Sequence, residues 1–318
     1  MSRPTDADGL LPPPEEDRAP RPAPPGGAGQ RTRPGKLRRF ARTVWRNKTG
    51  SISVLLILLI AGACLFADFL TPFEPNQQSI VDRLAAPGTE GANGTYLLGS
   101  DTLGRDVLTR LLHGGRVSLM IAGIAVLVSL VAGVVLGITA GHFGGWFDTF
   151  VMRLVDMQLA IPTLILGLGV MAIFGPTLRN VIFVLALTGW VHYARIVRAE
   201  VLSVREKEYM LAARSIGARH NRQIWVHVLP NVMASVIVLT SLRFGSLIIL
   251  EATLSFLGLG VQPPTPTWGN MISGGREVLA SAWWISTLPG LALSAIVIAF
   301  NLGGDWLRDV LDPRVEAE

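Results

Sequence analysis

The chain has 318 residues, of which 50% are hydrophobic and only 16% are charged, and its mean hydropathy is +0.44. This composition excludes an ordinary soluble enzyme and is typical of a protein that crosses the membrane several times. The single cysteine, Cys64, excludes an internal disulfide framework. The net charge of +5 comes from basic residues beside apolar runs, and membrane topology explains this placement better than nucleic-acid binding does.

Residues 1–35 are rich in proline, glycine and arginine and hold few large apolar side chains. Such a segment buries too little surface to offset the entropy of ordering, so we expect a disordered cytoplasmic arm. Six basic residues then precede the first apolar run, which fits an anchor on anionic lipid headgroups; a solvated tail without a partner fits them equally well. They are Lys36, Arg38, Arg39, Arg42, Arg46 and Lys48.

Six mainly apolar runs follow, and about 20 such residues are needed to cross ~30 Å of hydrocarbon. We expect spans at residues 49–67, 117–140, 154–174, 181–198, 232–257 and 285–302. Gly123, Gly133 and Gly137 in the second span indicate close helix contacts. Pro162 predicts a kink in the third. The predicted fold is therefore an all-α integral membrane protein with six transmembrane helices.

Lysine and arginine counts predict the orientation of these spans. Residues 1–48 carry 11 of them and residues 195–222 carry 7, whereas the loop at 71–116 carries 4. Because cytoplasmic segments are the more basic ones, both termini and the 195–222 segment should face the cytoplasm. The loops at 71–116, 175–180 and 259–284 should then lie outside. A five-span alternative would put the two termini on opposite sides.

The end of the first outer loop, residues 96–119, has the pattern of an amphipathic helix. Its apolar face would consist of Leu103, Val107, Leu108, Leu111 and Leu112. We expect this helix to lie in the membrane interface. The alternative is that it only packs the loop onto the spans, with Asp106 and Arg110 as an i, i+4 ion pair.

Two charged residues lie within the fifth span. Arg243 and Glu251 are eight residues apart, which places them about 80° apart around a helix and roughly 12 Å apart along it. Charges at membrane depth usually face protein or water, so these two are candidates for the lining of a translocation pathway. Pairing with another helix or subunit is the equally plausible structural alternative.

The stretch 208–230 is polar and basic between two apolar runs. Tyr209, Ala212, Ala213 and Ile216 recur at helical spacing, and Gly217 is placed to end that helix in the left-handed conformation. In a second amphipathic turn one group of side chains should lie together, apart from Arg219, Arg222 and Gln223. That group is Ile224, Trp225, Val228 and Leu229.

The pattern A-A-x-x-x-G followed by L-P resembles the cytoplasmic coupling loop of permease subunits in ATP-binding-cassette importers. Leu211 and His227 depart from the general pattern of this loop. Similar departures are usual in the dipeptide and oligopeptide branch, which has a glutamate at the position of Glu208 and an H-x-L-P ending. The strings LGSDTLGRD at 98–106 and LEATLSFLGLGVQPPTPTWGNMI at 250–272 resemble C-type permease subunits of that branch. The resemblance covers residues 37–314.

This resemblance implies a type I importer transmembrane domain in the cytoplasmic membrane. Residues 1–35 would be the arm, 36–115 the first span with its outer loop, 116–305 the permease core and 306–318 a cytoplasmic tail. The loop residues that would couple to the ATPase are Glu208, Tyr209, Ala212, Ala213, Gly217, His227, Leu229 and Pro230. Residues that would contact a binding protein outside are Asp101, Gly104, Arg105 and Asp106.

The resemblance also implies import of dipeptides or oligopeptides by an assembly of several proteins. The partners would be a B-type permease, two cassette ATPases that bind ATP and Mg, an extracytoplasmic peptide-binding protein and membrane lipid. The chain itself lacks the Gly-x-x-x-x-Gly-Lys-Ser/Thr loop that cradles phosphate, so we expect no ATP hydrolysis and no cofactor on it.

Three alternatives stay open. A nickel or opine importer shares the same motifs. An ion-coupled secondary transporter would need polar residues at broken helices in mid-membrane, for which Glu251 is the one candidate. A membrane-embedded enzyme would need convergent reactive residues, but the histidines are scattered without metal or triad spacing and are expected to be surface or packing residues. Those considered are His113, His142, His192 and His220.

Overall fold

The computed structural model of this chain describes residues 48–92 and 94–311. The predicted arm at 1–35, the basic residues from Lys36 to Arg46 and the last seven residues of the tail lie outside this part. In the part that the structure describes, helices dominate, and the one sheet is a small antiparallel hairpin of β1 (Thr89–Gly91) and β2 (Gly94–Tyr96). The all-α fold class is confirmed there.

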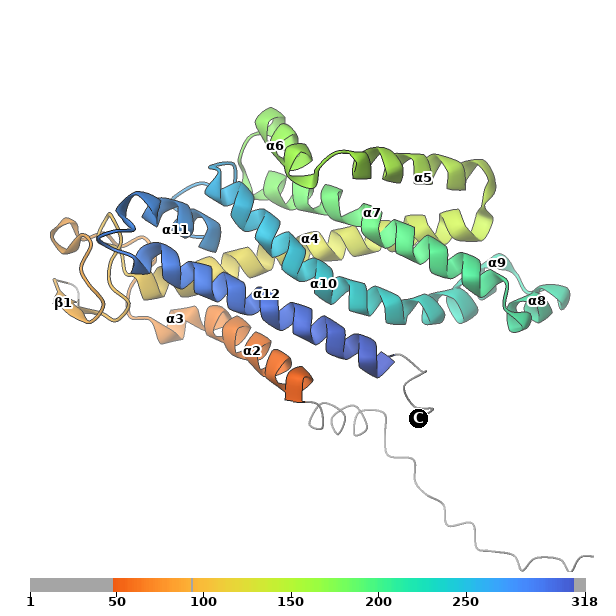
Figure 1. Cartoon of the computed structure of the whole chain (residues 1–318), viewed down its shortest axis with the longest axis horizontal. Helices are drawn as coiled ribbons and strands as arrows, with labels where there is room; N and C mark the ends of the chain where they lie inside the picture. Colours follow the sequence, from red (N-terminus) through yellow and green to blue (C-terminus); the bar gives the residue numbers. More distant parts are fainter. Residues whose placement is uncertain (1–47, 93, 312–318) are drawn as a thin grey trace, which may run out of the picture. The chain divides into compact units, whose positions relative to one another are not determined.

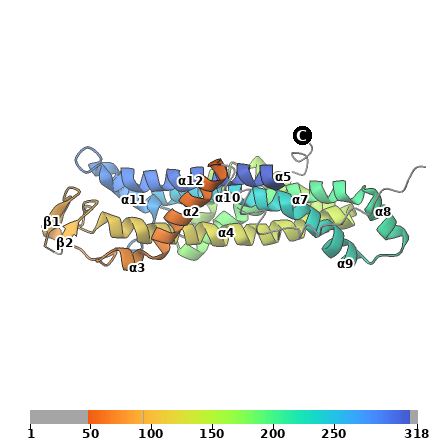
Figure 2. The same ribbon diagram turned by 90° about the horizontal axis from the view of Figure 1, so that it is seen from below.

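Five helices of the described part are long and apolar enough to cross a membrane. Figures 1 and 2 show them running alongside one another. They are α2 (Lys48–Leu65), α4 (Val107–Phe143), α7 (Leu178–Arg205), α10 (Leu229–Phe256) and α12 (Trp284–Leu311). They confirm five of the six predicted spans. Helix α10 is continuous with the two short elements before it, α9 (His220–Arg222) and the π-helical η2 (Gln223–Val228).

The third predicted span is broken rather than kinked. Its residues belong to α5 (Gly145–Ala160) and α6 (Thr163–Phe174), which are bent by 92°. Ile161, which precedes Pro162, has an extended backbone with ψ of 125°. Proline disfavours the helical region for the residue before it, and Ile161 adopts the extended region here, so the helix stops there. Six spans therefore require this bent pair to count as one.

The predicted interfacial helix is not a separate element. Helix α4 begins at Val107 and continues for 37 residues through the whole second span. Leu103 precedes it and is exposed. Gly114 and Gly115 do not interrupt the helix, because the segment around Thr267 and Trp268 packs directly against them. The prediction of a separate helix was therefore wrong, and an interfacial position of this segment stays a prediction.

Glycines hold α4 close to α7. A Cβ atom on Gly133 would collide with Tyr193, and one on Gly137 would lie 2.8 Å from the carbonyl oxygen of Ala194. Gly123 differs, since its Cβ would meet Phe244 at an ordinary 3.8 Å. Close helix contacts are confirmed for Gly133 and Gly137 and were wrong for Gly123.

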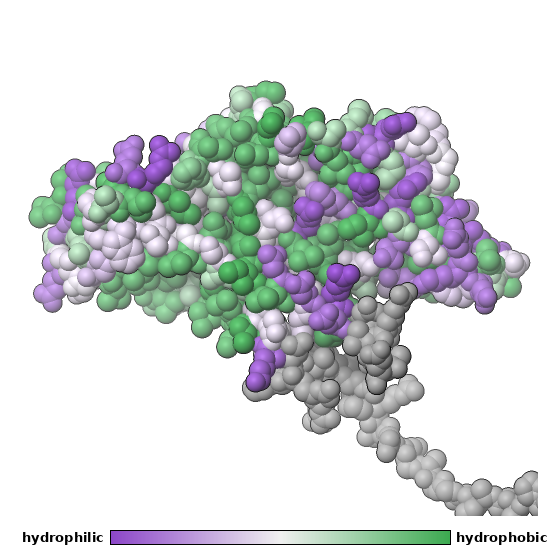
Figure 3. Space-filling model, viewed as in Figure 1, coloured by the Kyte–Doolittle hydropathy of each residue, from purple (hydrophilic) through white to green (hydrophobic). Residues whose placement is uncertain are grey.

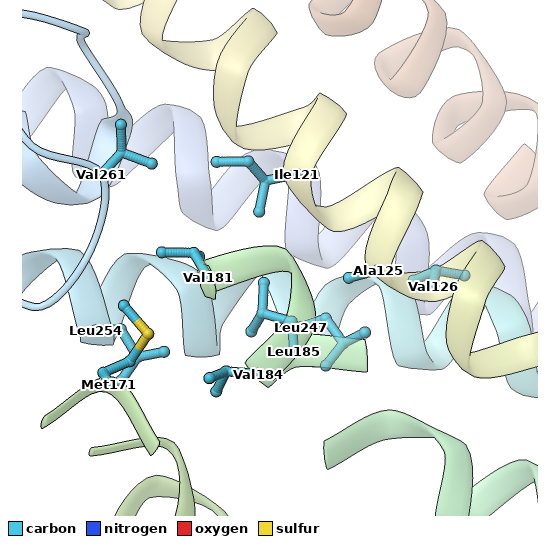
Figure 4. Packing of buried hydrophobic residues seen from close by; sticks show 10 residues of the cluster. All are labelled: Ile121, Ala125, Val126, Met171, Val181, Val184, Leu185, Leu247, Leu254 and Val261. Atoms are coloured by element: carbon cyan, nitrogen blue, oxygen red, sulfur yellow. The ribbon is translucent and has the colours of Figure 1, made fainter. Parts of the chain in front are cut away.

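A hydrophobic cluster from α4, α6, α7, α10 and the loop after α10 forms one core of the described part (Figure 4). On the face in Figure 3, hydrophobic residues cover the middle of the long helices, and hydrophilic residues gather near α8 (Glu208–Ser215) and α9. This distribution fits helices whose middle sections face lipid. The cluster consists of Ile121, Ala125, Val126, Met171, Val181, Val184, Leu185, Leu247, Leu254 and Val261.

The short elements gather at the two ends of the helices. The first loop holds α3 (Ala67–Leu70), η1 (Ile80–Asp82) and the hairpin, and the last loop holds α11 (Trp268–Gly275) and η3 (Arg276–Val278). Both lie at one end of the described helices, and α8 and α9 lie at the other (Figure 1). Two of the three loops predicted to lie outside, 71–116 and 259–284, thus share an end, opposite the 208–230 stretch.

Candidate functional site

The stretch 208–230 starts with the eight-residue helix α8. Gly217 has a φ of +78°, and the backbone N–H of Ala218 donates to the carbonyl of Ala213 at 3.0 Å. This six-to-one bond past a left-handed glycine is the usual way to end a helix. The predicted helix and its glycine stop are therefore confirmed.

The predicted face of α8 lines a hollow at the surface. Tyr209, Ala212, Ala213 and Ile216 border an open cavity of about 610 Å³, together with residues from 217–222 and His227. Ile216 is 86% exposed, and Tyr209 is 42% exposed. Met210 points the other way into a buried cluster of α7 and α10 valines. The helix is thus anchored by one side and offers an uncovered apolar face on the other.

The second turn of the stretch differs from its prediction. Gln223 is buried, and its amide donates to the carbonyl of Ala218 at 2.7 Å. Trp225 is 67% exposed, although it was expected to lie with Val228, which is fully buried. The cause is the π-helical turn over Gln223–Val228, because its i→i+5 hydrogen bonds widen the turn and shift side chains out of the expected 3.6-residue phase.

Two histidines connect this stretch to the end of α4. Nε2 of His142 lies 3.0 Å from Nδ1 of His220, and His142 is buried. Nearby, the guanidinium of Arg205 donates to the carbonyl of Gly141 at 2.7 Å. The two histidines are 78 residues apart, so sequence spacing carried no signal for this contact. The buried His142 and the exposed His220 agree with the prediction of packing or surface residues, which did not include their mutual contact.

The residues predicted to contact a binding protein instead hold their own loop together. The Asp101 carboxylate accepts from the backbone N–H groups of Leu103 and Arg105 and pairs with the Arg105 and Arg110 guanidiniums. Both Asp101 and Asp106 are buried, and Gly104 has a φ of +70° directly against Ser79. Arg105 is only partly buried, and the predicted contact with a binding protein stays a prediction.

Asp106 caps helix α4. Its carboxylate accepts from the backbone N–H of Thr109 at 2.7 Å and from the Thr109 hydroxyl at 2.6 Å. Arg110 therefore does not form the expected pair with Asp106, and it pairs with Asp101 at 3.5 Å. The string LGSDTLGRD is thus a folded turn that starts a transmembrane helix.

Arg243 and Glu251 do not share one site. Glu251 is 0% exposed, and its carboxylate accepts from Ser255 at 2.8 Å. Arg243 is half-buried on another part of α10, near His192 and Tyr193 of α7. A fully buried carboxyl does not fit the predicted pathway lining, whereas a lining role for Arg243 stays a prediction.

Charges of both signs surround a further cavity, of about 710 Å³, between α7, α10 and α12. Glu200, Lys207, Asp305 and Arg308 lie on its walls. The Glu200 carboxylate accepts from the Ser235 hydroxyl at 2.9 Å. Among the described residues no group of three or more His, Cys, Asp or Glu side chains is arranged to hold a metal ion.

Comparison with known families agrees with this arrangement. The family described as the binding-protein-dependent transport system inner membrane component matches residues 133–317, more than half of the chain. The N-terminal transmembrane domain of oligopeptide transport permease C matches residues 36–87. The chain belongs to the binding-protein-dependent permease family.

Full-length relatives exist among these permeases. A di/tripeptide transport system permease of Pseudomonas aeruginosa is 42% identical over 285 residues, covering 89% of this chain and 94% of the relative. A dipeptide transport system permease of Escherichia coli is 43% identical over 282 residues, covering 88% and 94%. One from Alkalihalophilus pseudofirmus is 36% identical over 298 residues, covering 94% and 96%.

Family membership places the chain in the cytoplasmic membrane as a multi-pass permease with the transmembrane fold of a type I importer. The hollow along α8 lies within the part that matches this permease family. The first span and the start of the outer loop belong to the separate N-terminal match.

Proposed function

We propose that this permease is one subunit of an ATP-driven importer that carries dipeptides or oligopeptides across the cytoplasmic membrane. The observation that carries the proposal is the uncovered face of α8, lined by Tyr209, Ala212 and Ile216, on a helix anchored by Met210. The relatives described above are named as dipeptide or di/tripeptide permeases, which favours peptides over nickel or opines.

The assembly needs other proteins for its energy and its cargo. The sequence has no phosphate-binding loop, so ATP and Mg would be bound by two cassette ATPases. A second permease would complete the membrane part, and a binding protein would deliver the peptide outside. One ATPase would dock on the α8 hollow of this chain, where small Ala212 and Ala213 allow close approach and Arg219 and Arg222 border the contact.

Replacing Ala212 with Asp tests this docking. Ala212 is exposed on α8, so the substitution does not disturb the core of the permease. An unpaired charge buried in a contact costs several kcal/mol, and ~1.4 kcal/mol corresponds to a factor of ten, so we expect copurification of the ATPase to fall at least about tenfold. Binding-protein-stimulated ATP hydrolysis and peptide uptake in reconstituted complexes should fall with it.

The matched control is Ala86→Asp, the same change at an exposed position of the opposite loop, which should leave the ATPase contact intact. Normal copurification and uptake with Ala212→Asp would rule out docking on this hollow. Peptide uptake that continues without any ATPase but follows an ion gradient would favour the secondary-transporter alternative.

A further inference from the structure

The start of α11 is seated in a notch between α4 and α10. Trp268 is 1% exposed; its backbone N–H donates to the Ser118 hydroxyl at 3.3 Å and its indole N–H to the carbonyl of Leu111 at 2.9 Å. A Cβ atom on Gly269 would lie 2.6 Å from the Cβ of Ser255. Helix α11 is therefore in direct backbone contact with both transmembrane helices.

Glu251 lies at the centre of this notch. Its Oε1 accepts from the Ser255 hydroxyl at 2.8 Å, and the Ser118 and Thr267 hydroxyls lie beside the same carboxyl. Oε2 has no accessible surface and completes no hydrogen bond of ordinary geometry within the described residues. None of the ion pairs in residues 48–92 and 94–311 includes Glu251. The carboxyl is thus buried between three helices, with hydroxyl groups beside it and no cation among its described neighbours.

The neighbouring hydroxyls have acceptor capacity left for a donor. The Ser118 oxygen already accepts from the Trp268 N–H, and the Thr267 oxygen accepts from the Asn270 N–H at 3.2 Å. A hydroxyl oxygen carries two lone pairs, so each can accept one more hydrogen bond. An ionised carboxylate offers no hydrogen, whereas a carboxylic acid does.

We propose that Glu251 is held as an uncharged carboxylic acid whose O–H donates a hydrogen bond to the Ser118 or Thr267 hydroxyl oxygen and so fastens α11 to α4 and α10. Burial of an ionised carboxylate without a cation is very costly, and protonation removes that cost. When the permease folds, water gives up the proton that forms the O–H bond of the acid, and the hydroxide stays in the solvent.

This makes Glu251 a positioning residue for the outer end of the permease. Helix α11 also contacts the start of α12, where the Ser286 hydroxyl donates to the carbonyl of Ile272 at 2.9 Å. A fixed α11 therefore keeps the ends of α4, α10 and α12 in one arrangement. The inference does not depend on which substrate is transported.

Three substitutions in the purified, membrane-reconstituted complex test the proposal. Gln has the shape of the acid and an N–H that can replace the donated proton, so backbone hydrogen exchange over residues 267–275 should stay within about twofold of the wild type in Glu251→Gln. Glu251→Ala removes the link and should exchange about tenfold faster. Glu251→Asp is too short to reach and should resemble Ala.

Infrared spectroscopy supplies the readout that a packing role alone would not change. The wild type at neutral pH should show the carbonyl band of a protonated carboxylic acid, which Glu251→Gln removes. Glu206→Gln, at an exposed carboxylate, should leave that band in place. Absence of the band in the wild type, or its survival in Glu251→Gln, would overturn the proposal even if the Ala variant failed to fold.

A bound sodium ion is the competing occupant of the notch. If sodium neutralises an ionised Glu251, exchange over residues 267–275 should accelerate when choline replaces sodium, and that result would also overturn the proposal. Exchange that is independent of sodium supports it.

Discussion

At the scale of single residues, Asp106 shows how burial and capping oppose each other. Burial raises the pKa of its carboxyl, and the hydrogen bonds from Thr109 act in the opposite direction. The cap at the start of α4 therefore needs an acceptor oxygen more than it needs a negative charge. An amide oxygen supplies the same acceptor without the cost of burying a charge.

We therefore expect Asp106→Asn to destabilise the permease much less than Asp106→Ala, which should cost about 1 kcal/mol. Thermal unfolding in lipid nanodiscs measures both. The pKa of Asp106 is higher in the folded state than in the unfolded state. The free energy of unfolding of the wild type, relative to that of the Asn variant, is therefore greatest below the ordinary pKa of aspartate. It should decline as the pH rises through the folded-state pKa. Equal losses in the Asn and Ala variants would contradict this account.

At the scale of elements, the pairing of α4 with α7 depends on glycines that repeat every four residues. Gly133, Gly137 and Gly141 lie against α7, and a Cβ on Gly141 would lie 2.9 Å from the Cβ of Val201. At these distances any side chain forces the two helices apart. Separation of α4 and α7 would also displace the 208–230 stretch, because this stretch follows α7 directly.

Gly137→Ala should destabilise the permease by about 1–3 kcal/mol, because the added methyl group overpacks the contact with Ala194 and Val197. The matched control is Gly123→Ala in the same helix. It should be neutral or stabilising by about 0.5–1 kcal/mol, since its Cβ has room and alanine favours helix. Denaturation of the two variants in the same detergent compares them, and similar changes of the same sign would show that this glycine contact is unimportant.

Elements with a local cause were predictable from the sequence, and elements that depend on distant residues were not. The long apolar runs and the stop at Gly217 needed only hydrophobicity and backbone sterics. Pro162 is compatible with a kink or a break, and the sequence alone did not distinguish the two. The contact of His142 with His220 and the burial of Glu251 arise from helix packing. Helical periodicity predicts the side of a helix on which a side chain lies, but it does not predict how deeply the side chain is buried.

At the scale of the whole described part, helix directions decide how often the chain crosses. Gly133 of α4 packs beside Trp190 of α7, and Gly141 packs beside Val201, so the two helices are parallel. The intervening bent pair must therefore bring the chain back to the end where α4 begins. Gly50 near the start of α2 lies against Trp306 near the end of α12, so these two helix ends lie on the same side. An even number of crossings follows, with α5 and α6 together as the third.

Cysteine labelling tests this arrangement and the orientation expected from the basic residues. After Cys64 is replaced by Ser, single cysteines at Gln262 and Thr177 should react with an impermeant thiol reagent in intact cells, because both positions lie at the end predicted to be outside. Cysteines at Trp146 and Arg222 should react only after the membrane is opened, and all four residues are exposed. Thr177 and Trp146 form the decisive pair, since they lie at the two ends of the bent helices. If both react from the same side, α5 and α6 enter and leave through one face, and the count of six crossings is wrong.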